Sequence, residues 1–247
     1  MNSELEKLIE DSFGLLRKVL VESSKVKGEP DYRMAFICRH TRSIYRLGQD
    51  IMFLLKANRL DSCPIIVRAM LESLFKLVAA VIKPETAVQI FISEIEGELK
   101  WMKKRLDPKG KDVALTIEQV SVFAEKLRRE HGVTSKKKWN TLACAEAAEL
   151  GQTYYLDEYF VFSKHAHAMT SGIMLRENKI GAGHVLQTLL FIVPYSAGRF
   201  AEANLSQSDI NEAGRLMQEL TKLAAKGIFS EMDRSSKVNS GCKQSPN

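Results

Sequence analysis

Cysteine and proline are scarce in this 247-residue sequence, and each shortage excludes a kind of structure. The four cysteines are far apart and form no C-x-x-C pair, which argues against a disulfide framework and against a zinc site. They are typical of reduced thiols in the cytoplasm. The six prolines lie near expected helix ends or in one late segment, which leaves long stretches rich in Leu, Ala, Glu, Lys and Met. Because strand patterns are also rare, we expect an all-α fold.

Long uncharged apolar runs are missing as well. The most apolar stretch, residues 65–82, carries Arg68, Glu72 and Lys76, and therefore predicts a buried central helix rather than a membrane span. Acidic residues interrupt the start of the chain, where a signal peptide would need an apolar core. We expect no membrane segment and a cytoplasmic location.

Apolar residues at helical spacing, bounded by caps, glycines and prolines, predict a multi-helix bundle. The expected helices cover approximately residues 4–26, 31–58, 63–83, 84–106, 116–127, 139–150, 154–169, 185–203 and 208–229. No linker and no internal repeat divides them, so residues 1–229 are predicted to form a single domain. From residue 230 onward apolar residues are nearly absent, which predicts a disordered tail over residues 230–247 because burial there cannot offset the entropy of ordering.

The expected central helix carries one polar stripe. Arg68, Glu72 and Lys76 are spaced by four residues, so they lie on one face of a helix that is otherwise apolar nearly all round. Arg68 and Glu72 can pair, because a buried charge needs a partner. Two interpretations follow: an internal ion pair that fixes packing, or the polar floor of a ligand pocket.

A second polar group lies in the segment V-F-S-K-H-A-H-A-M-T-S-G. Ser163 and His167 are four residues apart on one helical face, so the hydroxyl can bond to the imidazole. A serine hydrolase would also need an orienting group and an oxyanion site, and the sequence indicates neither. His165 and His167 point to different sides of a helix and have no carboxylate at ligand spacing, so we expect no metal site and no cofactor.

The excess positive charge of the chain lies in one region. Residues 100–138 contain twelve Lys and Arg against five Asp and Glu, a local charge of +7. With Trp101 and Trp139 nearby, this region could contact phosphates and stack on bases, or form an ordinary solvated face. The candidate nucleic-acid contacts are Lys103, Lys104, Arg128, Arg129 and Lys137.

Several runs of residues together resemble a known family. The run L-L-K-A-N-R-L-D-S-C-P-I-I-V-R-A-M-L-E-S, followed by W-N-T, Y-Y-L-D-E-Y-F-V-F-S-K-H-A-H and S-G, resembles a family of uncharacterised bacterial helical proteins, domain of unknown function 5677. In that family a helix with R-x-x-x-E pairs with a later Tyr-rich segment containing S-x-x-x-H. The resemblance covers roughly residues 39–184 and implies a polar centre made of Arg68, Glu72, Tyr159, Ser163 and His167.

Two functions are compatible with this polar centre. The first is a non-catalytic helical module that binds a small ligand or a protein partner through Arg68, Glu72 and His167, with Tyr159, Ser163 and Lys76 lining the pocket. The second follows from a broad likeness to the RNA-cleaving helical domains of toxin and phage-defence systems. In it, His167 is the general base of a metal-independent ribonuclease and Arg68 stabilises the developing charge. The sequence leaves the partner open, including a second copy of the chain.

Overall fold

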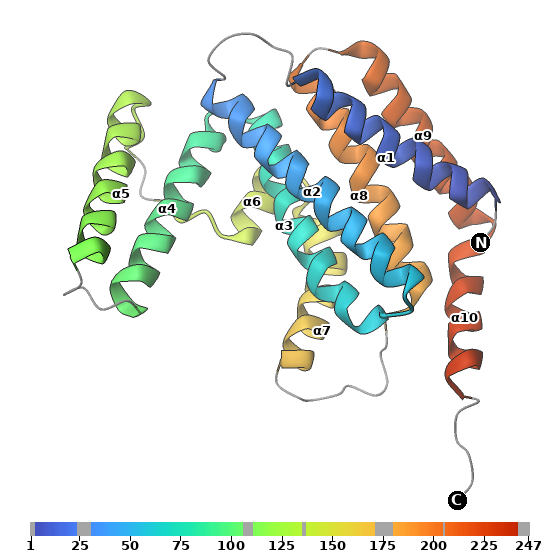
Figure 1. The fold of residues 1–247 in the computed structure, drawn as a ribbon. Helices are drawn as coiled ribbons and strands as arrows, with labels where there is room; N and C mark the ends of the chain where they lie inside the picture. Colours follow the sequence, from blue (N-terminus) through green and yellow to red (C-terminus); the bar gives the residue numbers. More distant parts are fainter. Residues whose placement is uncertain are drawn as a thin grey trace, which may run out of the picture.

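A computed structural model of the chain describes residues 3–23, 31–105, 111–134, 137–170, 180–204 and 206–241, without the side chains of 111–113, 152–153, 165, 167–170 and 235–241. Every regular element in these ranges is helical, which confirms the all-α prediction (Figure 1). The elements are α1 (Ser3–Ser23), α2 (Tyr32–Lys56), η1 (Leu60–Ser62), α3 (Cys63–Ile82), α4 (Thr86–Arg105), α5 (Lys111–Glu130), α6 (Thr141–Ala147), η2 (Gly151–Tyr159), α7 (Phe160–Thr170), α8 (Ala182–Ala203), α9 (Gln207–Ala225) and α10 (Ile228–Gly241). Within the same ranges, no helix has the length and apolar character needed to cross a membrane.

Helix α3 is the central element, as its composition predicts. Twelve of its 20 residues are buried, and it lies against α2, α4, α6, α7 and α8. The main hydrophobic cluster joins α3 to α1, α2, α8 and α9, which pack beside one another (Figure 1). An element that is apolar nearly all round is stable only when other helices cover it on several sides, which explains its place in the fold.

The ends of α2 and α3 are tied to each other by polar contacts. Asp31 precedes α2, and its carboxylate accepts a hydrogen bond from the backbone N–H of Arg33. The Arg33 side chain donates to the carbonyl oxygens of Ala80 and Val81 at 3.0 and 3.1 Å. Carbonyls in the last turn of a helix lack intrahelical partners, so this guanidinium caps α3. These contacts fix the start of α2 close to the start of α4.

Helices α4 and α5 form an antiparallel hairpin that projects from the other helices (Figure 1). Ala87 and Ile90 near the start of α4 belong to the main hydrophobic cluster, whereas five other buried residues of the hairpin form a small separate one. These five are Ile92, Ile95, Leu99, Ala124 and Leu127. The hairpin therefore has a core of its own, and the assignment of residues 1–229 to one domain stays a prediction.

The C-terminal helices differ from the expectation of one helix over residues 208–229. Two helices, α9 and α10, meet at Gly227, whose φ of +75° breaks the helical path. Helix α10 continues to Gly241, and residues 242–247 lie outside the described part of the chain. The division of the chain at residue 229 stays a prediction. Composition missed α10 because a polar contact helps to hold it: Asp233 accepts a hydrogen bond from the Gly183 N–H at 2.6 Å.

The close approach of α10 to Gly183 gives a first prediction. A Cβ at this position would lie 1.9 Å from the carbonyl oxygen of Phe229, which no side-chain rotation can relieve. We expect Gly183→Ala to weaken the docking of α10 by about 1–3 kcal/mol. Hydrogen exchange of the amides of residues 228–234 measures this loss.

The control for that measurement is Gly214→Ala in α9, where nothing lies within 4 Å of an added Cβ. This change should leave exchange in α10 as in the parent and stabilise α9 by up to about 1 kcal/mol. Equal exchange of α10 in both variants would show that the approach at Gly183 does not hold this helix.

Candidate functional site

Two residues of the predicted polar stripe meet a tyrosine from a distant segment. The Arg68 Nε lies 3.2 Å from Glu72 Oε1 and 3.3 Å from the Tyr159 hydroxyl oxygen. The Tyr159 hydroxyl donates to Glu72 Oε1 at 2.9 Å. Burial raises the pKa of Tyr159, which keeps its phenol neutral and able to donate this bond. Arg68, Glu72 and Tyr159, called the α3 triad below, are therefore brought together.

The α3 triad lies at the edge of the bundle, with Tyr159 buried and the two charged members partly exposed. The side chains of Arg68 and Glu72 are 30% and 31% exposed. This face of α3 is therefore only partly covered by its neighbours, and both interpretations, an ion pair that fixes packing and a polar pocket floor, stay predictions. A half-exposed pair contributes less to stability than a buried one, since water screens it. The triad can meet a ligand or partner from solvent.

Lys76 continues the stripe but has different partners. Its ammonium pairs with Oε1 of Glu94 on α4. The other carboxylate oxygen of Glu94 lies 3.5 Å from Nη1 of Arg39 on α2. Lys76 therefore links three helices and forms a separate group from the α3 triad.

Ser163 and His167 both lie on α7, which directly follows Tyr159. Ser163 is half-buried, whereas the side chain of His167 lies outside the description. Whether His167 joins the α3 triad therefore stays a prediction. The ribonuclease hypothesis depends on this side chain and stays a prediction with it.

A second polar group involves a histidine that the sequence analysis did not select. The Nε2 of His184 on α8 lies 3.1 Å from Glu158 Oε2, and Thr188 donates to the same oxygen at 3.2 Å. Hydrogen bonding with Glu158 raises the pKa of His184. Glu158 belongs to η2, where the expected helix over 154–169 instead begins as a π-helix at Gly151. A π-helical turn holds more residues than an α-helical one. In η2 the adjacent residues Glu158 and Tyr159 contact different helices: Glu158 meets His184 on α8, and Tyr159 meets Glu72 on α3.

The predicted nucleic-acid contacts do not gather into one patch. They are Lys103 and Lys104 in the last turn of α4, Arg128 and Arg129 in the last turn of α5, and Lys137 beyond α5. Because the hairpin is antiparallel, the first two lie toward the end of it opposite to the second two (Figure 1). Arg128 pairs with Glu96, and the Lys137 ammonium lies 4.3 Å from the ring centroid of Trp139. Nucleic-acid binding by these residues stays a prediction.

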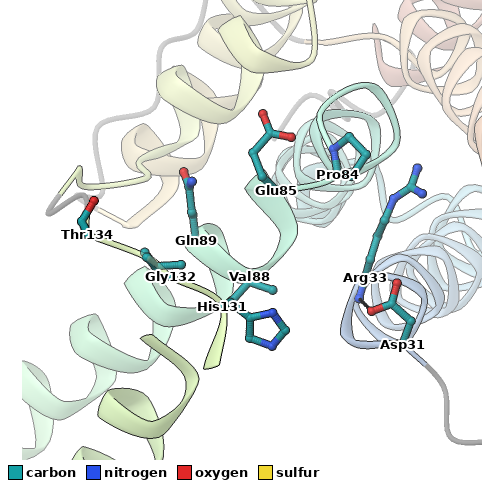
Figure 2. A pocket seen from close by; sticks show the side chains of 10 residues that line it. Asp31, Arg33, Pro84, Glu85, Val88, Gln89, His131, Gly132 and Thr134 are labelled. Carbon is teal, nitrogen blue, oxygen red and sulfur yellow. Dashed lines mark hydrogen bonds between the residues drawn. The ribbon is translucent and has the colours of Figure 1, made fainter. Parts of the chain in front are cut away.

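A hollow of about 450 Å³ lies between the start of α2, the start of α4 and residues 131–134. Figure 2 shows Asp31 and Arg33 on one side of it, with His131 and Gln89 on the other and Glu85 above. The His131 ring stands edge to face against Tyr32, with 5.2 Å between ring centroids. The sequence analysis missed this hollow because its walls come from separate parts of the chain.

A second hollow, of about 290 Å³, continues along the first turns of α4. Glu85 and Gln89 line both hollows, and Lys83, Lys137 and Trp139 line only the second. The α3 triad lines neither. Among the residues that the structure describes, no group of three His, Cys, Asp or Glu side chains could hold a metal ion.

The sequence pattern of a family of unknown function, DUF5677, matches residues 34–181. This match covers more than half of the chain, so the chain belongs to that family. It includes the α3 triad and most of the walls of both hollows, whereas α1 and α8–α10 lie outside it. No curated protein and no solved structure is found to match the chain.

Proposed function

We propose that this member of the DUF5677 family is a binding protein, and that its ligand is a small organic amine held in the larger hollow. The observation that supports this is that Asp31 and Glu85, two acidic residues from different helix starts, line one hollow of about 450 Å³ (Figure 2). Concave sites that bring a few polar groups together are where small ligands bind.

The charges around the hollow favour a cation. Asp31 and Glu85 are both exposed, so their charges are available to a ligand. The positive charge of Arg33 is directed at the carbonyl oxygens of Ala80 and Val81, where it offsets the negative end of the α3 dipole. An ammonium group bound in the hollow would gain a charge-assisted hydrogen bond from a carboxylate that it meets there, and a diamine could use both.

The remaining walls suit the rest of an amine ligand. Gln89 offers an amide that can donate or accept a hydrogen bond. Val88 and the face of the His131 ring supply apolar area for a short carbon chain. A hydroxylated or branched amine would use both the Gln89 amide and this apolar area, whereas a bare ammonium ion would contact neither.

Binding of an amine panel to matched variants tests the proposal. The panel contains diamines, guanidines, amino alcohols and amino acids, each compared with the same carbon skeleton carrying a carboxylate alone. We expect at least one amine to bind the parent protein, and Asp31→Asn and Glu85→Gln each to weaken it about tenfold, because each removes one charge-assisted bond. Asn also caps a helix, so Asp31→Asn keeps α2 intact. Isothermal titration calorimetry gives the affinities.

Two further variants make the result specific. Glu10→Gln removes an exposed carboxylate on α1, far from the hollow, and should leave affinity as in the parent. Arg68→Ala removes the guanidinium from the α3 triad. If only this variant lost amine binding, the binding site would be the triad and not the larger hollow. If carboxylates bound and amines did not, the proposed ligand class would be refuted.

A further inference from the structure

Helix α5 has two apolar faces, and among the residues that the structure describes only the inner face is covered by another helix. Its inner face carries Ala124 and Leu127, which pack on α4 in the small cluster of the hairpin. Its outer face carries Leu115 and Val122, which are 54% and 57% exposed, and Phe123 at its edge is 40% exposed. Leu115 and Val122 are seven residues apart, so they lie on one stripe of the helix. A second apolar stripe on a solvent-facing helix indicates that something covers it.

The hairpin is also short of core for a structure that projects from the bundle. Its cluster contains five buried residues, two of which come from α5. A layer of two helices buries apolar side chains on one side only, and stable helical architectures add further helices to cover the rest. Two hairpins packed through α5 would set four helices side by side, with both faces of each α5 covered.

We propose that the outer face of α5 is a homodimer interface, in which α5 of a second copy packs antiparallel to it with Val122 near the two-fold axis. A two-fold interface must be complementary to itself, because the same surface takes part from both copies. If one residue of the first copy contacts a second residue of the partner, the reverse contact is also made. Glu118 and Lys126 lie four residues on either side of Val122. Antiparallel packing therefore sets Glu118 opposite the partner's Lys126, and Lys126 opposite the partner's Glu118.

Other charges on the stripe agree with this arrangement. Within the chain Lys126 pairs with Glu130 at 3.6 Å, and both side chains are well exposed, at 63% and 44%. Such a pair is weak and can exchange for an interface contact. Arg129 lies seven residues after Val122 and faces the partner's Leu115, which its aliphatic stem can cover. Parallel packing would instead set Glu118 against the partner's Glu118, so the charges select the antiparallel dimer.

Sedimentation equilibrium across a range of protein concentrations tests the proposal. We expect the full chain to be a dimer and Val122→Glu to be a monomer, because the substitution places two carboxylates at the axis. Val21→Glu is the matched control, since Val21 is 48% exposed on α1, away from the hairpin. Circular dichroism shows whether each variant keeps its helices.

A charge exchange tests the register without inserting charge into the apolar stripe. Glu118→Lys and Lys126→Glu should each weaken the dimer about tenfold, because each sets like charges opposite one another at two symmetric places. The double variant should restore the affinity of the parent.

A parent protein that is monomeric at all concentrations overturns the proposal. A dimer that survives Val122→Glu overturns it as well, and assigns the contact to another exposed apolar group such as Phe53 and Phe160. A dimer lost in Val122→Glu but unchanged in both single charge variants overturns the antiparallel register.

Discussion

The unfolding free energy is expected to fall by about 1.4 kcal/mol per pH unit below about pH 6, relative to a His40→Leu variant, because His40 is buried as a neutral imidazole. His40 lies on α2 and is 5% exposed. Burial, together with the nearby positive charges of Lys76 and Arg39, lowers the pKa of His40 to about 3. Its Nε2 has no hydrogen-bond partner among the described residues.

The sign of this effect follows from the two pKa values. In the unfolded chain His40 titrates near its ordinary pKa of 6.5, whereas in the folded chain it titrates at about 3. Between these values only the unfolded state takes up the proton, so acid favours unfolding. Above pH 6.5 both states are neutral and the histidine contributes no pH dependence.

Denaturant unfolding of the parent and of His40→Leu at intervals from pH 7 to pH 4 measures the difference. Leucine has a similar volume and no proton to take up, and carboxylates common to both proteins cancel in the comparison. We expect the unfolding free energy of His40→Leu, relative to that of the parent, to rise by about 3 kcal/mol between pH 7 and pH 4. Parallel profiles would contradict the assignment of His40 as a neutral buried group.

The second large change in unfolding free energy is expected when a large buried side chain is removed from the central helix α3. Leu74 is fully buried on α3. We expect Leu74→Ala to lower the unfolding free energy by about 2–5 kcal/mol, through lost transfer free energy and the cavity that remains. Urea unfolding at pH 7 measures the loss.

Leu156→Ala is the matched control, because Leu156 is 58% exposed on η2. This change should alter the unfolding free energy by no more than about 0.5 kcal/mol. Similar losses in the two variants would mean that α3 is not the centre of the core.

Sequence patterns predicted the helices well where the signals are local. The start of α2 at Asp31 and the start of α3 beside Pro64 follow from capping and from proline in the first turn. The C-terminal end was predicted less well, because α10 is held by Asp233 and the close approach at Gly183 as well as by a short apolar group of Ile228, Phe229 and Met232. Composition cannot register a single hydrogen bond between distant residues.

The candidate site also has parts that local sequence patterns predicted and parts that depend on contacts between distant residues. The sequence by itself determined that α3 is central and that Arg68 can reach Glu72, because helical periodicity alone sets residues four apart on one face. The family resemblance indicated Tyr159 as part of the same polar centre, and the tertiary structure supplied its contacts with Arg68 and Glu72. Only the tertiary structure decided that His184 meets Glu158. It also decided where the larger hollow lies (Figure 2). Contacts between helices depend on how whole surfaces pack, and that packing is not encoded in the spacing of any one segment.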